Sequence, residues 1–404
     1  MFGALNRKSE FSRQKEEEEI FNIRNFGQHT NNQRKRSYCD ETSLFGYRRD
    51  TSQSTRELVQ FLVDEECEGI GLVPTNEESM DDDGGGDDDD DGGVEIGYSS
   101  ETGIRGLFAR GDYETGDFLC AIPFPTTLLI DDAEVGGDTT DADRGLLFMQ
   151  MFQDSTSTKT TGSDWSAYLG CLPTRDNSFD PTPDFFTSDQ IKSLEFPDLI
   201  NGASQRRQDI QRVADQHGVD MDELQFATWI VKSRCFTIVR LKEIDPLNDP
   251  GKKVIHIRSV MIPLLDMINH SSDNPNAELE VVETKIDDES FYALQATRPI
   301  KANEEITISY GSGQDSSIDL FLNYGFIPAS NPYDVDYLRS EQEKGGDSFK
   351  GSSQWSTLEE DVEELKSIQG KLTSTSKDDQ THRRILEFRI QMKRALLEID
   401  PKNS

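Results

Sequence analysis

The stretch between Val260 and Pro328 carries the residues best suited to chemistry. Asp266, Asn269 and His270 follow directly on an apolar run, where a polar group without a hydrogen-bonding partner would be costly. Further along, Tyr310 stands at the end of an alternating, half-buried strand with glycines behind it, where a hydroxyl can orient a reacting group. The stretch therefore offers a carboxylate, an amide, an imidazole and a phenol for hydrogen bonding and alignment.

A further candidate is Arg234, which the helical spacing of Leu224, Ala227 and Val231 places on an otherwise apolar stripe. An inward-facing arginine needs an anion. Taken alone, the position is explained better by a buried ion pair or by a side chain that reaches back to solvent.

Local patterns predict the elements that position these residues. Glu278 to Glu283 and Phe291 to Ala296 are expected to form a hairpin, and Glu305 to Gly311 a strand that leads to Tyr310. A capping box at Ser316 to Asp319 predicts a short helix over Leu320 to Asn323 that ends near Gly325.

The rest of the chain predicts an α+β fold. Strands are expected upstream, and a helical stretch from about Arg144 to Cys235 interrupts the β pattern before it resumes at Val254. Thr187 to Gln190 form a capping box for a helix through Leu194. Past Asp334, a polar glycine-serine stretch leads to two amphipathic segments that could pair as a helical hairpin. The expected upstream elements are a helix marked by Leu58, Phe61 and Leu62, and strands at Val94 to Tyr98, Gly103 to Ala109, Phe118 to Ile122 and Thr127 to Ile130.

The composition narrows the class of protein and of partner. A formal net charge of -35 disfavours binding to nucleic acid or anionic membranes and favours a protein partner with a basic segment, such as a histone tail or a ribosomal protein. Five scattered cysteines without a CxxC pair indicate neither a zinc site nor a disulfide framework. No apolar run reaches the roughly 20 residues of a membrane span. We expect a monomer in the cytoplasm or nucleus, with a plastid location left open.

Two segments lack the composition of a packed core. Residues 1 to 52 are polar and without periodicity, which predicts disorder. The basic residues 34 to 36 are explained better as a solvated charge cluster than as a nuclear signal. The acidic, glycine-rich tract from Glu77 to Gly93 predicts a flexible insertion, because charge repulsion and the entropy of glycine oppose a packed core. Calcium binding is the alternative, but the tract lacks the spaced ligands and the terminal glutamate of an EF-hand loop.

The chain resembles the SET-domain methyltransferases, in particular the branch of the RuBisCO large-subunit and actin-histidine methyltransferases. The segments that carry the resemblance extend from Val94 to Asp334 with one large insertion, and include Asn269-His270, Tyr310 and Tyr324-Gly325-Phe326. The resemblance implies a SET-domain β-fold of short sheets over residues 53–335, with a helical insertion at 144–235. A shortened helical substrate-binding region is expected at 336–404.

The resemblance also implies S-adenosyl-L-methionine as cofactor and protein-lysine N-methylation, of a histone or another protein, as activity. Tyr310 would be the catalytic residue, without a metal. Protein-histidine methylation and a catalytically silent peptide-binding module are the alternatives. The implied cofactor-binding residues are Arg105, Gly106, Leu107, Arg234, Asp266, Asn269 and His270, and the implied channel residues are Phe236, Tyr324 and Phe326.

Overall fold

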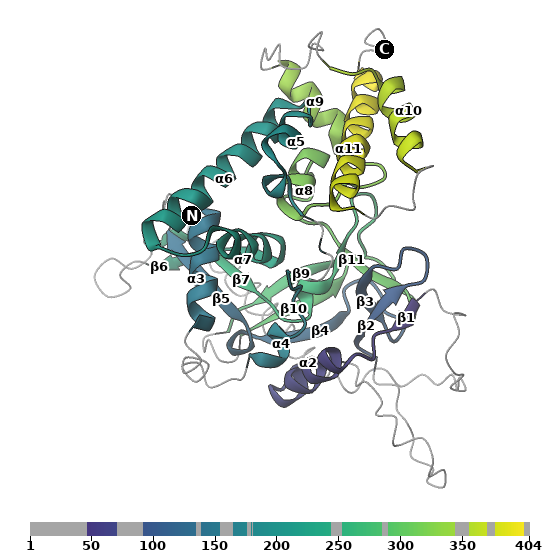
Figure 1. The fold of residues 1–404 in the computed structure, drawn as a ribbon. Helices are drawn as coiled ribbons and strands as arrows, with labels where there is room; N and C mark the ends of the chain where they lie inside the picture. The colour runs from purple at the N-terminus through teal and green to yellow at the C-terminus, as the bar shows by residue number, and fades with distance from the viewer. Residues whose placement is uncertain are drawn as a thin grey trace, which may run out of the picture. The chain divides into compact units, whose positions relative to one another are not determined.

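The computed structural model describes residues 47–70, 92–134, 139–153, 165–175, 179, 181–243, 253–284, 290–343, 355–369 and 376–399. The chain forms two compact units, of which one contains Met1–Pro125 and Asn276–Thr307, and the other Thr126–Pro275 and Ile308–Ser404. Figure 1 labels most of the helices and strands of both units. No helix among the described residues is both long and apolar enough to cross a membrane.

The described residues of the first unit form two antiparallel groups of strands and one helix. In the first group the strands are neighbours in the order β1-β2-β3-β11, and in the second the order is β4-β10-β9. The predicted hairpin and the strands predicted to begin at Val94, Gly103 and Phe118 are confirmed within one or two residues, whereas the strand predicted to end at Ile130 extends to Glu134. The elements are β1 Tyr47–Arg49, α2 Gln53–Asp64, β2 Val94–Ser99, β3 Arg105–Ala109, β4 Phe118–Pro123, β9 Ala277–Val282, β10 Phe291–Ala296 and β11 Glu305–Ile308.

Strand β1 corrects the expectation of disorder up to residue 52. Tyr47–Arg49 pair with β2, and the Tyr47 ring stacks on Phe108 with centroids 4.2 Å apart. Gly97 makes room for this ring, because a Cβ at that position would lie 2.5 Å from it. Three residues carry too little local pattern to be recognised as a strand, and the pairing partner decides their conformation. The predicted disorder of residues 1–46 falls outside the described residues.

The end of the acidic tract belongs to the first unit. Gly93 is buried with φ 87°, and the Tyr113 hydroxyl donates to its carbonyl over 2.8 Å while accepting from its N–H. Residues 71–91 lie outside the described residues, so the flexible insertion predicted for the tract stays a prediction.

The second unit combines one antiparallel sheet, ordered β5-β7-β6, with most of the helices. Strand β6 was missed in the sequence because it follows α7 without a break, at Cys235, and its alternation is diluted by Arg240 and Lys242. The elements are β5 Leu128–Glu134, α3 Asp141–Gln153, α4 Ser166–Leu169, α5 Ser188–Lys192, α6 Pro197–His217, α7 Met221–Arg234, β6 Cys235–Glu243, β7 Lys253–Met261, β8 Asn269–His270, α8 Ser317–Tyr324, α9 Tyr333–Glu343, α10 Leu358–Gln369 and α11 Lys377–Ile399. Short 3₁₀ turns lie at η1 Phe124–Thr126, η3 Pro183–Phe185 and η4 Leu265–Met267.

Both predicted capping boxes are confirmed. Thr187 with Gln190 begins α5, and Ser316 with Asp319 begins α8. Helix α5 ends at Lys192, earlier than predicted, and α8 ends at Gly325 in the left-handed conformation, φ 83°. A helix C-terminus of this kind favours glycine because a Cβ is strained there.

Helix α9 corrects the expectation of a polar stretch past Asp334. Leu338 is fully buried, and the buried Asp334 carboxylate accepts from the Ser317 N–H and hydroxyl at 2.6 and 2.7 Å. These contacts come from elsewhere in the chain, which is why the local sequence gave little sign of the helix.

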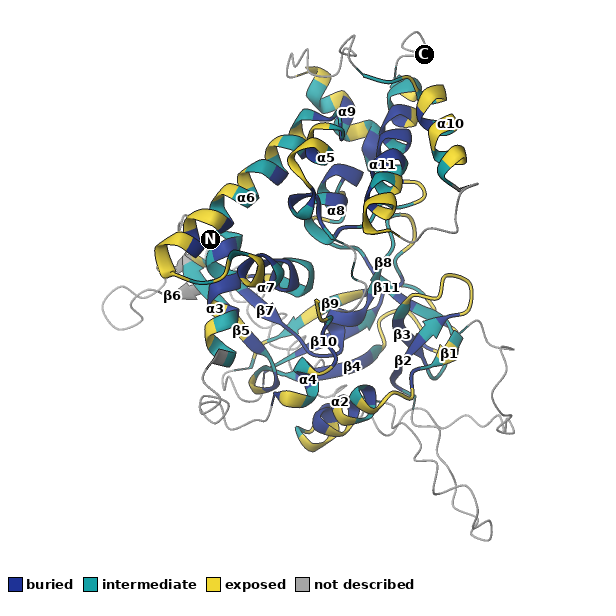
Figure 2. Ribbon diagram, viewed as in Figure 1, coloured by how far each residue is buried: buried dark blue, intermediate teal, exposed yellow. Residues whose placement is uncertain are grey.

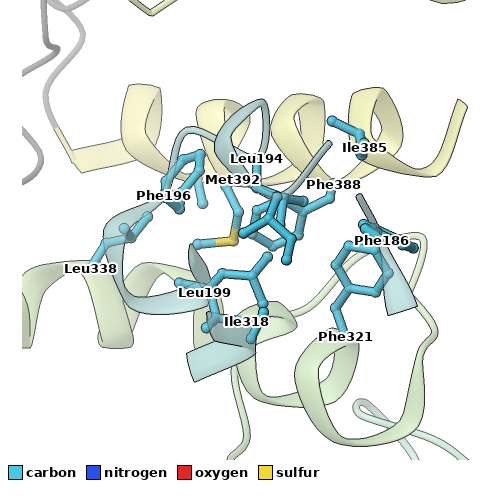
Figure 3. Close-up of a cluster of buried hydrophobic side chains, with 13 residues drawn as sticks. Phe186, Leu194, Phe196, Leu199, Ile318, Phe321, Leu338, Ile385, Phe388 and Met392 are labelled. Carbon is cyan, nitrogen blue, oxygen red and sulfur yellow. The ribbon is translucent and has the colours of Figure 1, made fainter. Parts of the chain in front are cut away.

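The helical part of the second unit packs around α11, whose buried face is dark blue in Figure 2. Phe388 and Met392 lie among the apolar side chains of α5, α6, α8 and α9, as Figure 3 shows. The apolar spacing of α11 in the sequence predicted this face. The labelled members of the cluster are Phe186, Leu194, Phe196, Leu199, Ile318, Phe321, Leu338, Ile385, Phe388 and Met392.

A buried group of charges joins α10 to α11, the two helices that were predicted to pair as a hairpin. Lys393 Nζ lies 2.6 Å from Asp361 and 2.7 Å from Glu195, and Arg389 pairs with both carboxylates. Asp361 is fully buried. Two cations face two anions, so each charge depends on the others for compensation.

We expect Asp361→Asn to lower the free energy of unfolding by about 3 kcal/mol, because it leaves two buried cations with one carboxylate. Chemical denaturation of the full chain measures the change. Glu359→Gln, on the exposed side of the same helix, is the matched control and should change it by less than about 0.5 kcal/mol. Equal effects of the two variants would show that the buried charges do not hold α10 in place.

Candidate active site

The polar group predicted around Asp266 begins at a strained turn. Leu264 is buried with φ 72° and ψ -53°, a conformation that a side chain with a Cβ rarely adopts. The 3₁₀ turn Leu265–Met267 follows, and then the short strand β8 with Asn269 and His270. Strain of this kind concentrates at functional sites, where surrounding contacts enforce it.

His270 and Tyr310 are joined through the backbone. The Tyr310 N–H donates to His270 Nδ1 over 2.9 Å, so this nitrogen carries no proton, and Nε2–H donates to the Ser272 hydroxyl over 2.7 Å. Burial lowers the pKa of His270 to about 4, against the opposing effect of Asp315 and Asp273. The imidazole is therefore neutral at physiological pH, in one tautomer.

The Tyr310 hydroxyl is held at a fixed place. It donates to the carbonyl of Ile268 over 2.5 Å, and the Tyr310 ring lies 5.1 Å from the ring of His270. A phenol held by its donor proton can still accept a contact at its oxygen. Strand β11 ends at Ile308, so it is shorter than the predicted Glu305 to Gly311, and Tyr310 follows it by two residues.

Tyr324 and Phe326 complete a ring cluster with His270 and Tyr310. The centroid of the Tyr324 ring lies 4.7 Å from that of Tyr310 and 6.2 Å from that of Phe326, and the Phe326 centroid lies 5.5 Å from that of His270. Burial raises the pKa of Tyr324 to about 12, with Asp315 adding to the rise and a backbone hydrogen bond at Gly311 opposing it. Neutral aromatic faces of this kind attract a cation and the apolar stem of a lysine side chain.

Arg234 is paired with Asp266, the alternative that the sequence left open. Its Nη1 lies 3.1 Å from the Asp266 carbonyl and 3.3 Å from the carboxylate, which also accepts from the Tyr168 hydroxyl over 2.8 Å. Arg234 Nε is buried and has no hydrogen-bond partner among the described residues. The guanidinium therefore keeps a donor that a further acceptor can satisfy.

The other predicted site residues have separate surroundings. Phe236 lies half-buried on β6, opposite Val260, and takes no part in the ring cluster among the described residues. Asn269 is half-buried at the start of β8. Among the described residues no cluster of side chains is suited to hold a metal ion.

Arg105, Gly106 and Leu107 belong to the first unit, on β3. Arg105 Nε donates to Asp50 over 2.8 Å and Nη2 to Thr55 over 2.7 Å, so the side chain ties the start of α2 to the sheet. Leu107 is fully buried. The side chains of Arg105 and Leu107 thus have structural roles in this unit, and the part of all three residues in cofactor binding stays a prediction.

Sequence reasoning did not assign Tyr168 and Ser272 to the site. Tyr168 is fully buried and holds the Asp266 carboxylate, while the Ser272 hydroxyl accepts from Nε2–H of His270. For Ser272 the signal was its position two residues after the histidine. For Tyr168 no local signal shows that a residue 98 positions before Asp266 would be its partner.

Comparison with known proteins places this geometry in a family. The SET-domain family model matches residues 104–311, within the predicted domain of residues 53–335. "SET domain-containing protein 8" of Schizosaccharomyces pombe (strain 972 / ATCC 24843) is 23% identical over 251 residues, which are 55% of this chain. The match covers 51% of that protein, so the chain spans about half the length of this relative.

Solved structures share the fold. Two structures of the SET domain of LSMT, one bound to lysine and AdoHcy and the other to MeLysine and AdoHcy, both have TM-scores of 0.50 at 15% and 17% identity. They cover 87% and 88% of this chain, and 91% and 92% of their own. The α+β fold and the family expected from the sequence are confirmed. Since the family model accounts for half of its length, the chain belongs to the SET-domain family.

Proposed function

We propose that the chain is an S-adenosylmethionine-dependent protein-lysine N-methyltransferase. The observation that carries the proposal is the Tyr310 hydroxyl, held by the Ile268 carbonyl within a cluster of neutral rings from His270, Tyr324 and Phe326. The solved structures of similar fold are of a SET domain bound to lysine or MeLysine with AdoHcy. That likeness supports the choice of reaction, and of lysine as the proposed acceptor.

The residues present fit the proposed cofactor. Arg234 offers its buried Nε donor to the carboxylate end, and Asn269 would offer hydrogen bonds to the amino group and adenine. The neutral His270, whose two ring nitrogens already bond the Tyr310 N–H and Ser272, would hold this segment in place. Asp266 holds Arg234 in place. When bound, the cofactor supplies a methyl group already activated on a sulfonium, so the protein mainly contributes alignment and exclusion of water.

The chain's own residues account for that alignment. The Tyr310 hydroxyl donates a hydrogen bond to the Ile268 carbonyl, so its oxygen remains available as an acceptor for polarised C–H groups and for the amine. Tyr324 and Phe326 provide aromatic faces against which a lysine stem can pack. Neutral rings in a half-buried cluster also favour the neutral amine, because burial disfavours its charged form.

The substrate class follows from charge. A net charge of -35 attracts a basic protein segment by long-range electrostatics and repels nucleic acid. Labelling a cell lysate with the full chain and isotopically labelled S-adenosylmethionine, followed by mass spectrometry, would identify the target and the modified residue. Methyl label on lysine side chains is expected, and wild-type chain that binds no cofactor and labels no protein would contradict the proposed function.

We expect Tyr310→Phe to reduce kcat by at least about 100-fold while the Kd for S-adenosylmethionine changes less than about threefold. The hydroxyl would act mainly in the transition state, so its loss affects turnover more than binding. Steady-state kinetics and calorimetry measure the two quantities. Tyr333→Phe is the matched control, since the Tyr333 hydroxyl has no hydrogen bond in the described part of the chain. Loss of cofactor affinity with normal residual turnover would refute this role of Tyr310.

The pH profile distinguishes lysine from histidine as acceptor. The pKa of His270 is about 4 and that of Tyr324 about 12, so neither titrates between pH 6 and pH 9. With lysine as acceptor, kcat/KM should rise about tenfold per pH unit across this range, because the reference pKa of the amine is about 10.4. With histidine, the rise should flatten soon after its reference pKa of about 6.5. A plateau above pH 7 with methyl label on an imidazole would replace lysine by histidine.

A further inference from the structure

The end of helix α8 leaves backbone groups that need partners. The last carbonyls of a helix have no intrahelical donor, and α8 ends at Gly325, whose N–H donates to Phe321 over 3.1 Å. The chain reverses there, and the residues on either side of the glycine are Tyr324 and Phe326. Both rings of the proposed channel therefore depend on how this one helix end is held.

Arg206, on α6, supplies a donor to one of these carbonyls. Its Nη1 donates to the Leu322 carbonyl, and its Nη2 donates to the Asn323 side chain over 2.8 Å. The Arg206 side chain is only 11% exposed. A guanidinium at a helix C-terminus also interacts favourably with the helix dipole. One side chain thus binds both residues that precede Tyr324.

Arg206 is itself fixed by two carboxylates. Asp184, 2% exposed, lies 3.5 Å from Nη1, and Asp141 lies 3.8 Å from Nη2. Asp141 also pairs with Lys232, two residues before Arg234 on α7. The planar fork of arginine matches this arrangement, whereas a lysine ammonium has no second arm to reach both acceptors.

Close packing next to Arg206 is a second, independent sign that α6 sets the position of α8. Gly202 lies one helical turn before Arg206, and a Cβ there would come within 2.6 Å of the Leu322 side chain. The two helices thus meet at the residue whose carbonyl Arg206 binds. A shift of α8 at this point would move Tyr324 with it.

We propose that Arg206 is a positioning residue that sets Tyr324 and Phe326 against Tyr310, a role that rests on the proposed function. The rings lie 4.7 and 6.1 Å from the Tyr310 ring. A misplacement of about 1 Å in an aligned site costs up to about 100-fold in rate. Because Arg206 acts through α8, its loss affects transfer to the acceptor and leaves the Arg234 end of the site in place.

The test uses the full chain with four variants. Arg206→Met removes both arms of the guanidinium, Arg206→Lys keeps one charged donor, and Asn323→Ala removes one acceptor without burying an unpaired charge. Arg212→Met is the matched control, because Arg212 lies on the same helix, 51% exposed, and pairs only loosely with Asp209 at 3.9 Å. For each variant we measure the Kd for S-adenosylmethionine and the hydrogen exchange of residues 320–328. We also measure kcat, and the number of methyl groups added per acceptor, with the target protein that the wild-type chain methylates.

With Arg206→Met we expect a fall in kcat of roughly 10- to 100-fold, a Kd within about twofold of wild type, and faster exchange at 320–328. Arg206→Lys and Asn323→Ala should be intermediate, with an altered ratio of mono- to dimethylated product, and Arg212→Met should match wild type. The proposal is overturned if Arg206→Met matches Arg212→Met, or if Kd and kcat worsen in parallel, as general unfolding would cause. Failure of the proposed function is distinct, because wild type would then bind no cofactor, while the exchange comparison between Arg206→Met and Arg212→Met still tests the helix contact.

Discussion

The carboxylate of Asp266 is the constraint around which one side of the site is built. A buried negative charge must be compensated, and here Arg234 and Tyr168 compensate it from two other helices. The strained residue Leu264 lies two positions earlier, so the same turn that places the carboxylate also leads the chain into Asn269 and His270. The cost of burying Asp266 is offset by partners that, at the same time, fix the orientation of an arginine with an unused donor.

The ring cluster of His270, Tyr310, Tyr324 and Phe326 depends on neutrality. His270 accepts one hydrogen bond and donates another, which fixes a neutral tautomer, and burial keeps it neutral. The rings of Tyr324 and Phe326 add apolar faces without a charge. In such surroundings a cationic acceptor is bound by ring faces and loses its proton more readily than in water. An anionic group at this point would favour the protonated, unreactive form of the acceptor.

The sequence itself determined much of the fold and the positions of several candidate site residues. Capping boxes, alternating strands and the apolar stripe of α11 are local patterns, because their physical causes act within a few residues, and the structure confirms them. The run from Asp266 to His270 and the tyrosine after β11 were likewise recognisable from spacing. The net charge set the class of expected partner without any structure.

Tertiary structure alone decided what depends on partners far along the chain. Strand β1 forms because it pairs with β2 and its Tyr47 ring stacks on Phe108. Helix α9 is anchored by the hydrogen bond between Asp334 and Ser317. No local pattern could show that Arg234 faces Asp266, or that Arg206 binds the end of α8 116 residues later. Spacing predicts which side chains share a face of one element, whereas the pairing of buried charges depends on which elements meet, and only the folded chain determines that.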